Sequence, residues 1–340
     1  MLGSSKLKCD TVNFINASYA NSTWRKHNSA IASLNEFGAA KQCNIVWPLD
    51  LDTILAYVTW GLTEKKWAPA TVKSYLSSIE TVHKLKNLCV KNFDNFLISA
   101  VIKGAENLRF SNCIMKPHRL AMSIQILKLL GHEISSSDWS INSKCVCWSA
   151  CCVAFFGSLR LGEMLSNSER NFDPSCILRW EDVKFIGTES ILLHIRLPKS
   201  RAQEGEFVDI FEYPKAGLCP VKLLKNLLVQ AKNSDSFKCS DPVFMFNSGL
   251  LLSMDKFNST IRSLLSCHLG EESRLISAHS FRAGIPSIVA KFPDIASDQE
   301  VMGWGRWKSG NSHRRYTRLE YSRKRCIYGK ILAAIQADHQ

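Results

Sequence analysis

Residues 305–318 of this 340-residue chain read GRWKSGNSHRRYTR, so that one tyrosine, Tyr316, stands among four arginines, Lys308 and His313. A phenol ionises at about pH 10 and is a poor nucleophile at neutral pH unless nearby positive charge stabilises the phenolate. The same cations attract an anionic group that such a nucleophile would attack. The segment therefore predicts either a solvated basic face or a site for an anion.

Three other stretches carry cationic side chains of the types that bind or protonate phosphate oxygens. These residues are Arg160 with Glu163 in SLRLGEML, Lys199 in PKSR, and His279 with Arg282 in HSFR. Each has a structural alternative. Arg160 and Glu163 have the spacing of a surface ion pair, Lys199 has the surroundings of an exposed hairpin lysine, and a His-x-x-Arg pattern is unspecific by itself.

The sequence contains no pattern that predicts a metal or a cofactor. It has no P-loop signature, no dinucleotide-binding glycine pattern and no clear carboxylate cluster for Mg²⁺. Four cysteines cluster without a CxxC pair, at positions that point in several directions on a helix, namely Cys145, Cys147, Cys151 and Cys152. We therefore expect them to be small core residues, and we expect no bound metal and no cofactor.

The charge balance favours a polyanionic partner. Lys and Arg number 43 against 30 Asp and Glu, which gives a net charge of +13. Nucleic acid and an anionic membrane surface both fit this excess, as does a merely soluble basic protein. The most apolar run, at 145–157, is shorter than the about 20 residues of a spanning helix. Scattered cysteines and the lack of a secretory signal predict reduced thiols and an intracellular protein.

The first third of the chain has helical periodicity throughout. Apolar residues recur at helical spacing in four segments, at about 23–40, 50–64, 70–86 and 93–109. Asp50 is expected to cap the second helix. The expected apolar faces are Val72, Tyr75, Leu76, Ile79 and Val82 in the third helix, and Phe93, Phe96, Leu97, Val101 and Leu108 in the fourth. Four such helices predict a small bundle.

The rest of the chain predicts a second domain of mixed structure. The periodicity is lost at 109–121, around Pro117, which indicates a linker. Two strand-like runs at 190–213 are joined by a polar basic turn. Helices are expected at about 121–131, 143–157, 220–231, 255–268, 279–291 and 321–337, with Pro286 kinking or delaying one of them. We therefore expect a mostly α-helical protein with a small antiparallel β-sheet, divided into residues 1–110, a linker at 111–120, and residues 121–340.

The order Arg, Lys, His-x-x-Arg, Trp, Tyr resembles the active-site pattern of the tyrosine recombinase, or phage-integrase, family. The resemblance covers residues 117–340 at the level of motifs, and the N-terminal helices resemble the core-binding domain of that family in layout. GRWKS followed by RRY is similar to the branch found in eukaryotic mobile elements of the Crypton, Ngaro and DIRS type.

The resemblance implies a role for each of these residues. Arg160 and Arg282 would clamp the scissile phosphate, because a planar guanidinium holds two oxygens at once. Glu163 would help to arrange the site, and His279 would donate a hydrogen bond or accept a proton near the attacking oxygen. Lys199 would be the general acid that protonates the leaving oxygen, with Arg201 as the alternative.

The remaining two roles fall in the tyrosine segment. Trp307 stands nine positions before Tyr316 and would donate its indole N–H to the phosphate, with Trp304 as the alternative. Tyr316 would be the nucleophile, and Tyr321 is its alternative. Apolar residues repeat in the following helix, at Ile327, Ile331, Leu332 and Ile335, and form one stripe. This stripe either packs against its own domain or, as the resemblance implies, docks onto a neighbouring copy.

The function implied by the resemblance is site-specific recombination of double-stranded DNA through a 3′-phosphotyrosine intermediate, in a tetrameric synapse and without metal or cofactor. A role in integrating or excising a mobile element would follow from the branch, as would a nuclear location in a eukaryotic cell. The alternatives are a type IB topoisomerase-like enzyme and a domesticated DNA-binding protein that no longer cleaves.

Overall fold

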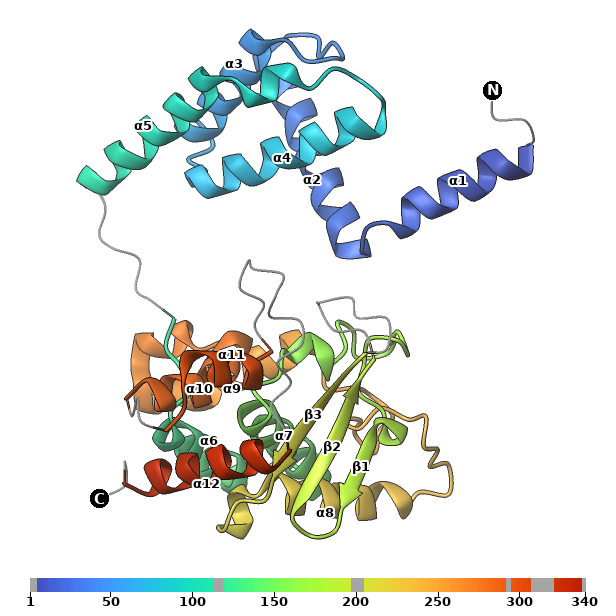
Figure 1. The fold of residues 1–340 in the computed structure, drawn as a ribbon, viewed down its shortest axis with the longest axis vertical. Helices are drawn as coiled ribbons and strands as arrows, with labels where there is room; N and C mark the ends of the chain where they lie inside the picture. Colours follow the sequence, from blue (N-terminus) through green and yellow to red (C-terminus); the bar gives the residue numbers. More distant parts are fainter. Residues whose placement is uncertain (1–4, 113–118, 197–204, 292–294, 307–320, 338–340) are drawn as a thin grey trace. The chain divides into compact units, whose positions relative to one another are not determined.

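The computed structural model describes residues 5–112, 119–196, 205–291, 295–306 and 321–337. The chain forms two compact units, Met1–Lys116 and Pro117–Gln340, called here the N-terminal and C-terminal units. The last helix of the N-terminal unit continues to Asn112, and the division between the units falls within residues 111–120, the segment that the sequence predicts as a linker. The two units are described separately (Figure 1).

The described part of the N-terminal unit is helical throughout. Its elements are α1 (Ser5–Ala17), α2 (Asn21–Lys41), α3 (Leu51–Thr63), α4 (Pro69–Leu85), the 3₁₀ helix η1 (Lys91–Asp94) and α5 (Phe96–Asn112). Asp50 caps α3 as predicted, because its Oδ1 accepts a hydrogen bond from the Thr53 amide at 2.7 Å. The sequence analysis missed α1, which precedes the first periodic segment.

The predicted apolar face is right for α4 and wrong for α5. Val72, Leu76 and Ile79 of α4 are buried in the core of the unit, but Phe96 and Leu108 of α5 are 79% and 69% exposed. The residues of α5 in the core are instead Ile98 and Ile102. Because α5 carries apolar residues on more than one side, its periodicity could not show which side packs against α3 and α4.

The C-terminal unit contains helices and one antiparallel sheet. Its helices are α6 (Ile124–Ser136), α7 (Ile141–Phe156), α8 (Pro220–Lys232), α9 (Met254–Leu269), α10 (Ala278–Lys291), α11 (Asp298–Trp304) and α12 (Tyr321–Ala337). Its 3₁₀ helices are η2 (Leu161–Glu163), η3 (Trp180–Asp182), η4 (Ala216–Leu218) and η5 (Gly270–Leu275). The sequence analysis missed α11. Pro286 lies inside α10, which nevertheless starts at Ala278 and continues to Lys291.

The sheet has the strand order β1-β2-β3, with β1 (Val183–Ile186), β2 (Ser190–Ile195) and β3 (Glu206–Phe211). Both strand pairs are antiparallel. The sequence analysis predicted β2 and β3 but not the four-residue β1. The predicted fold class, mostly α-helical with a small antiparallel sheet, is confirmed for the residues that the structure describes.

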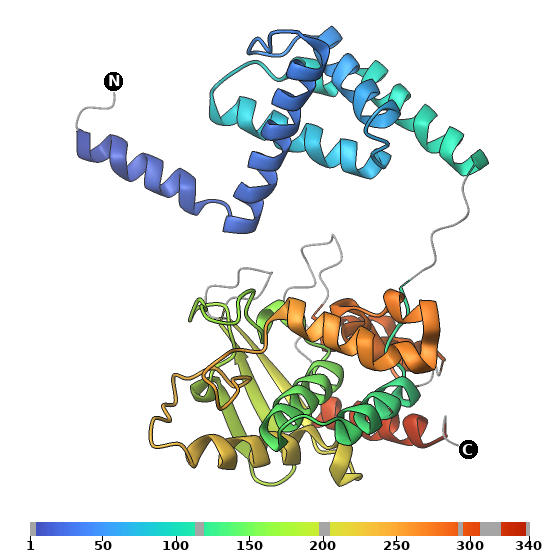
Figure 2. The same ribbon diagram turned by 180° about the vertical axis from the view of Figure 1, so that it is seen from behind.

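Helix α7 lies at the centre of the C-terminal unit. Figure 2 shows the helices of this unit from behind. Helix α7 contacts α6, α8, α10 and β3. Ten of the eleven residues at 146–156 are buried, the exception being Trp148, and the buried ones include Cys147, Cys151 and Cys152. Burial raises the pKa of these three thiols, as expected of core cysteines.

The apolar stripe of α12 packs within its own unit. Ile327, Ile331 and Ile335 are buried in the core of the C-terminal unit. The Tyr328 hydroxyl donates a hydrogen bond to the Phe211 carbonyl of β3 at 3.0 Å. In a single chain, this stripe is therefore buried within the C-terminal unit, where α12 packs against α10. No described helix has the length and apolar character that a membrane span requires.

Candidate active site

Arg282 enters the core of the C-terminal unit from the second turn of α10. Its side chain is almost fully buried, with the residue 3% exposed. Its Nη1 donates to the Ser158 carbonyl at 2.8 Å, and its Nη2 donates to the Gly305 carbonyl. The backbone thus holds the guanidinium through two carbonyl oxygens that are 147 positions apart in sequence numbering, which is why no local pattern could reveal its partners.

Arg160 and Glu163 lie at the turn that follows α7. The backbone after α7 reverses at Ser158, whose φ is +45°, and η2 starts after Arg160. Oε2 of Glu163 accepts from the Arg160 amide at 2.9 Å, and Oε1 accepts from Arg160 Nη1 at 2.7 Å. The pair is not the surface contact that the alternative interpretation expected, because only 4% of the Glu163 side chain is exposed.

Arg306 joins this pair from the end of α11. Its Nη2 donates to Oε2 of Glu163 at 2.6 Å, and its Nη1 approaches Oε2 of Glu206, at the start of β3, at 3.3 Å. Glu163 therefore lies between two arginines. The sequence analysis counted Arg306 only as part of the charge around Tyr316 and did not consider Glu206.

Four of the charges affect one another through the low-dielectric interior. Burial, then Arg160 and then Arg306 lower the pKa of Arg282 to about 10. Burial also raises the pKa of Glu163, but Arg306 and Arg160 outweigh it and hold that pKa below its ordinary value. The carboxylate is thus ionised at neutral pH, while the arginines repel one another. An anion bound beside them would relieve this repulsion.

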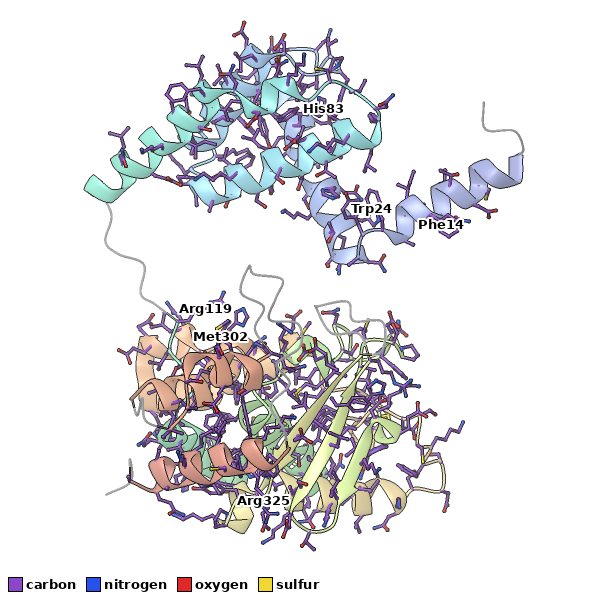
Figure 3. All side chains as sticks on the ribbon, viewed as in Figure 1. Phe14, Trp24, His83, Arg119, Met302 and Arg325 are labelled. Atoms are coloured by element: carbon purple, nitrogen blue, oxygen red, sulfur yellow. The ribbon has the colours of Figure 1, made fainter. Side chains whose placement is uncertain are left out.

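A pocket of about 250 Å³ opens beside the arginine cluster. Its lining includes His279, which is exposed in the first turn of α10, together with Arg282 and Arg119. Figure 3 labels Arg119 at the start of the C-terminal unit. The Met122 amide donates to the Ser280 carbonyl at 2.9 Å and ties this segment to α10. The sequence analysis assigned Arg119 to the linker and missed its place in the pocket.

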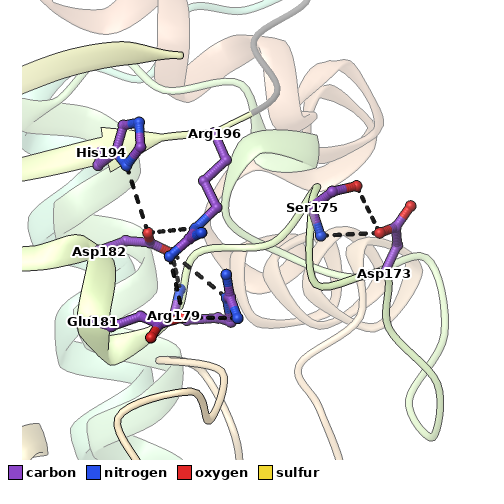
Figure 4. Close-up of polar contacts among 7 residues, drawn as sticks. All are labelled: Asp173, Ser175, Arg179, Glu181, Asp182, His194 and Arg196. Atoms are coloured by element: carbon purple, nitrogen blue, oxygen red, sulfur yellow. Dashed lines mark hydrogen bonds and ion pairs between the residues drawn. The ribbon is translucent and has the colours of Figure 1, made fainter. Parts of the chain in front are cut away.

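A second ionic network fixes the end of β2 (Figure 4). Arg196 follows β2 and donates through Nε to Asp182 Oδ1 at 2.6 Å and through Nη2 to Glu181 Oε1 at 3.1 Å. Arg179 Nη1 also contacts Glu181 Oε1, at 2.7 Å. The network anchors the chain immediately before the predicted turn that contains Lys199.

Three predicted site residues, Lys199, Trp307 and Tyr316, lie outside the described residues, as does Arg201. Of the remaining alternatives, Trp304 has a packing role, whereas the side chain of Tyr321 lies outside what the structure describes. The ring of Trp304 stacks on that of Tyr328, with centroids 6.1 Å apart. Burial raises the pKa of Tyr328 well above its ordinary value, so its phenol is not activated as a nucleophile. Among the residues described, no group of three His, Cys, Asp or Glu side chains is placed to hold a metal ion.

Solved structures with a similar fold are tyrosine recombinases and integrases. No protein-family model and no curated protein matches the sequence. One similar structure is the XerH site-specific recombinase bound to its difH substrate, with a TM-score of 0.54 and 14% identity over 88% of this chain and 77% of that one.

Two further similar structures are integrases. The Tn1549 transposon integrase, in complex with transposon right-end DNA, has a TM-score of 0.53 and 11% identity, over 92% of this chain and 94% of that one. Lambda integrase, as a dimer bound to a core site, has a TM-score of 0.52 and 13% identity, over 92% of this chain and 95% of that one. At these identities, the likeness shows a shared fold.

Proposed function

We propose that this protein is a site-specific recombinase that cuts and rejoins double-stranded DNA through a covalent bond to Tyr316. The observation that carries the proposal is the convergence of Arg160, Glu163 and Arg282, from separate motifs, on one buried cluster beside the His279 pocket. A fold similar to that of the XerH, Tn1549 and lambda enzymes, which were solved bound to DNA, supports it.

The proposed reaction exchanges one phosphodiester bond for another. The Tyr316 oxygen attacks the scissile phosphorus while its proton passes to His279, the bond to the 5′ oxygen breaks, and Lys199 protonates that oxygen as it leaves. Arg160 and Arg282 balance the charge on the nonbridging oxygens, and Trp307 donates to one of them. The products are a 3′-phosphotyrosine and a free 5′ hydroxyl, and attack by a 5′ hydroxyl of the partner strand reverses the step.

The positions of Glu163 and His279 in the described site fit these roles. Glu163 holds Arg160 at two points, because it accepts from the guanidinium Nη1 and from the backbone amide, so it fixes the direction in which that arginine donates. His279 is exposed in the pocket, where it can reach a bound substrate, whereas the phosphate-binding Arg282 lies deeper. A buried guanidinium held by two carbonyls keeps its position before DNA binds, which lowers the cost of reorganisation.

Several finer features belong to the same proposal. Both units would bind the duplex, with phosphate affinity that falls as salt rises. The GRWKS and RRY pattern supports a role in moving a mobile element, within a eukaryotic nucleus. Assembly into a tetramer through α12 would require its apolar stripe to leave the core of its own unit, where Ile331 and Ile335 are buried.

The decisive experiment is covalent trapping on duplexes of randomised sequence that carry a nick. Cleavage next to a nick releases a short fragment, so the adduct cannot be resealed, and sequencing the trapped DNA gives the target site. We expect the wild-type chain to form an adduct. Tyr316→Phe should bind the same DNA and form none, because the attacking oxygen is absent.

Tyr328→Phe is the matched control, since that phenol is buried against Phe211, and it should keep the adduct. Normal adduct in Tyr316→Phe would remove Tyr316 from the mechanism. Loss of adduct in Tyr321→Phe alone would transfer the role of nucleophile to Tyr321. A wild-type chain that binds DNA without forming any adduct would instead identify a non-cleaving DNA-binding protein.

A further inference from the structure

Arg306 contacts the candidate site with its charged end directed at protein carboxylates. Its Nη2 lies 2.6 Å from Glu163 Oε2, and its Nη1 lies 3.3 Å from Glu206 Oε2. The side chain is only 10% exposed. Because both terminal nitrogens face carboxylates, which neutralise its charge, this guanidinium is arranged to hold protein groups in place. Arg282 is held by neutral carbonyls instead, and so keeps its positive charge for a phosphate.

The backbone beside Arg306 holds the second arginine of the site. The carbonyl of Gly305, the residue before it, accepts from Arg282, and the Ser158 carbonyl accepts from the other terminal nitrogen. Ser158 and Arg306 both have left-handed backbone, with φ of +45° and +53°. Such conformations are rare outside glycine and persist where surrounding contacts maintain them, which is typical of functional sites.

Residues 305 and 306 therefore reach both proposed phosphate-binding arginines. Gly305 reaches Arg282 directly through its carbonyl. Arg306 reaches Arg160 through Glu163, whose second oxygen accepts from Arg160 Nη1 at 2.7 Å. The short segment that ends α11 thus connects two side chains that belong to α10 and to the turn after α7.

We propose that Arg306 is a positioning residue that sets the spacing and orientation of the Arg160 and Arg282 guanidiniums for a phosphodiester. The inference rests on the proposed function, since it gives Arg306 a positioning role in the same site. Removal of Arg306 would leave Glu163 with Arg160 alone and would release the segment whose carbonyl holds Arg282. Both guanidiniums would then lose a fixed support, although neither is altered itself.

The test compares Arg306→Met with the wild-type chain on two nicked duplexes of the trapped sequence. One carries the ordinary phosphodiester, and the other carries a methylphosphonate at the scissile position, which has no negative charge for guanidiniums to balance. We expect Arg306→Met to slow adduct formation on the phosphodiester by about 100-fold, the scale of a small misplacement of catalytic groups. The methylphosphonate should react at nearly the wild-type rate.

Two variants complete the design. Arg306→Lys keeps the charge but lacks the fork that reaches both carboxylates, so it should restore only part of the rate. Arg325→Met removes an exposed ion pair with Glu189, 2.9 Å long at the other end of the sheet, and should behave as wild type. If Arg306→Met does not fold, Glu206→Gln removes the second anchor, and it should slow the phosphodiester selectively by a smaller factor.

The outcomes separate the positioning role of Arg306 from the proposed recombinase function. A wild-type rate on the phosphodiester in Arg306→Met, or equal losses on both substrates, overturns the positioning role while the recombinase proposal stands. A wild-type chain that forms no adduct on either duplex overturns both. Selective loss on the charged substrate, partly recovered in Arg306→Lys, supports the role.

Discussion

The two units bury their ionisable groups in different ways. Among the described residues of the N-terminal unit, buried ionisable groups with polar partners include Tyr57, whose hydroxyl lies 2.6 Å from that of Ser33, and His83. The Nε2 of His83 accepts from the Leu49 amide at 3.1 Å, and its Nδ1 lies 2.9 Å from the Ile79 carbonyl. Both nitrogens are satisfied with the ring neutral, and burial lowers the pKa of His83. Figure 3 labels His83 among the side chains of this unit.

The C-terminal unit instead buries charges. Glu163 and Arg282 are 4% and 3% exposed, and both stay ionised through their charged and carbonyl partners. Described ion pairs of the N-terminal unit, such as Lys73 with Glu106 at 2.8 Å, lie at the surface. Burial of an ion pair seldom adds stability over an apolar core, because desolvation cancels much of the attraction. The contrast teaches that the buried charges have a role other than stability, which the proposed phosphate site supplies.

The largest effect that would sharpen this contrast is the loss of the Glu163 charge. Glu163→Gln removes the carboxylate that pairs with Arg160 and Arg306. Breaking a buried ion pair by removing one partner lowers the unfolding free energy by about 3–5 kcal/mol. We expect the loss in urea unfolding of the full chain, with hydrogen exchange accelerated in α7 and α10. Glu106→Gln is the control, which at an exposed pair should change less than about 1 kcal/mol. Equal effects of the two substitutions would remove the contrast.

An intermediate effect is expected from adding one methyl group in each unit. A Cβ at Gly284 of α10 would lie 2.4 Å from Phe155 Cε2 and 2.8 Å from the Met122 carbonyl oxygen. Gly284→Ala should therefore destabilise the C-terminal unit by about 1–3 kcal/mol through overpacking. At Gly104 of α5, no described atom lies within 4 Å of the added group.

Gly104→Ala should accordingly stabilise the N-terminal unit by up to about 1 kcal/mol, because alanine favours the helix. Thermal unfolding should show a lower midpoint for Gly284→Ala and a higher one for Gly104→Ala. Hydrogen exchange assigns each transition to its unit. A destabilising Gly104→Ala would show that α5 has a packing partner against this side.

The smallest expected effect concerns acid, where the units should respond at different pH. The folded pKa of His83 lies below that of an unfolded histidine, about 6.5, so its contribution to stability is present above that pH and is lost as the pH falls below it. Glu163 also has a lowered pKa, but its contribution is lost only as the pH falls below about 4.3, the value in an unfolded chain.

Hydrogen exchange between pH 7.5 and 5 should therefore show the N-terminal unit weakening before the C-terminal unit. His83→Gln should reduce the change in the N-terminal unit without affecting the other. His27 is also buried, and burial followed by Lys26 lowers its pKa, so part of the change should remain in that variant. Simultaneous weakening of both units would contradict the assignment of the titrating groups.

Much of the fold followed from local patterns. Helical periodicity predicted α2, α3, α4 and the main helices of the C-terminal unit, and the capping residue Asp50 marked the start of α3. These signals are local, because a helix forms hydrogen bonds between residues four apart and buries one face against the core. Short elements such as β1 and α11, and the choice of core face on α5, depend on neighbours that no local window contains.

By itself, the sequence determined the types of chemistry-bearing residue and their order, which is how Arg160, Glu163, His279 and Arg282 were selected. Only the tertiary structure decided which other residues complete the cluster. Arg306 and Glu163 are 143 positions apart, and Arg306 and Glu206 are 100 apart. Contacts of this kind depend on where whole helices and strands pack, since a charge finds its partner through space and leaves no periodic trace along the chain.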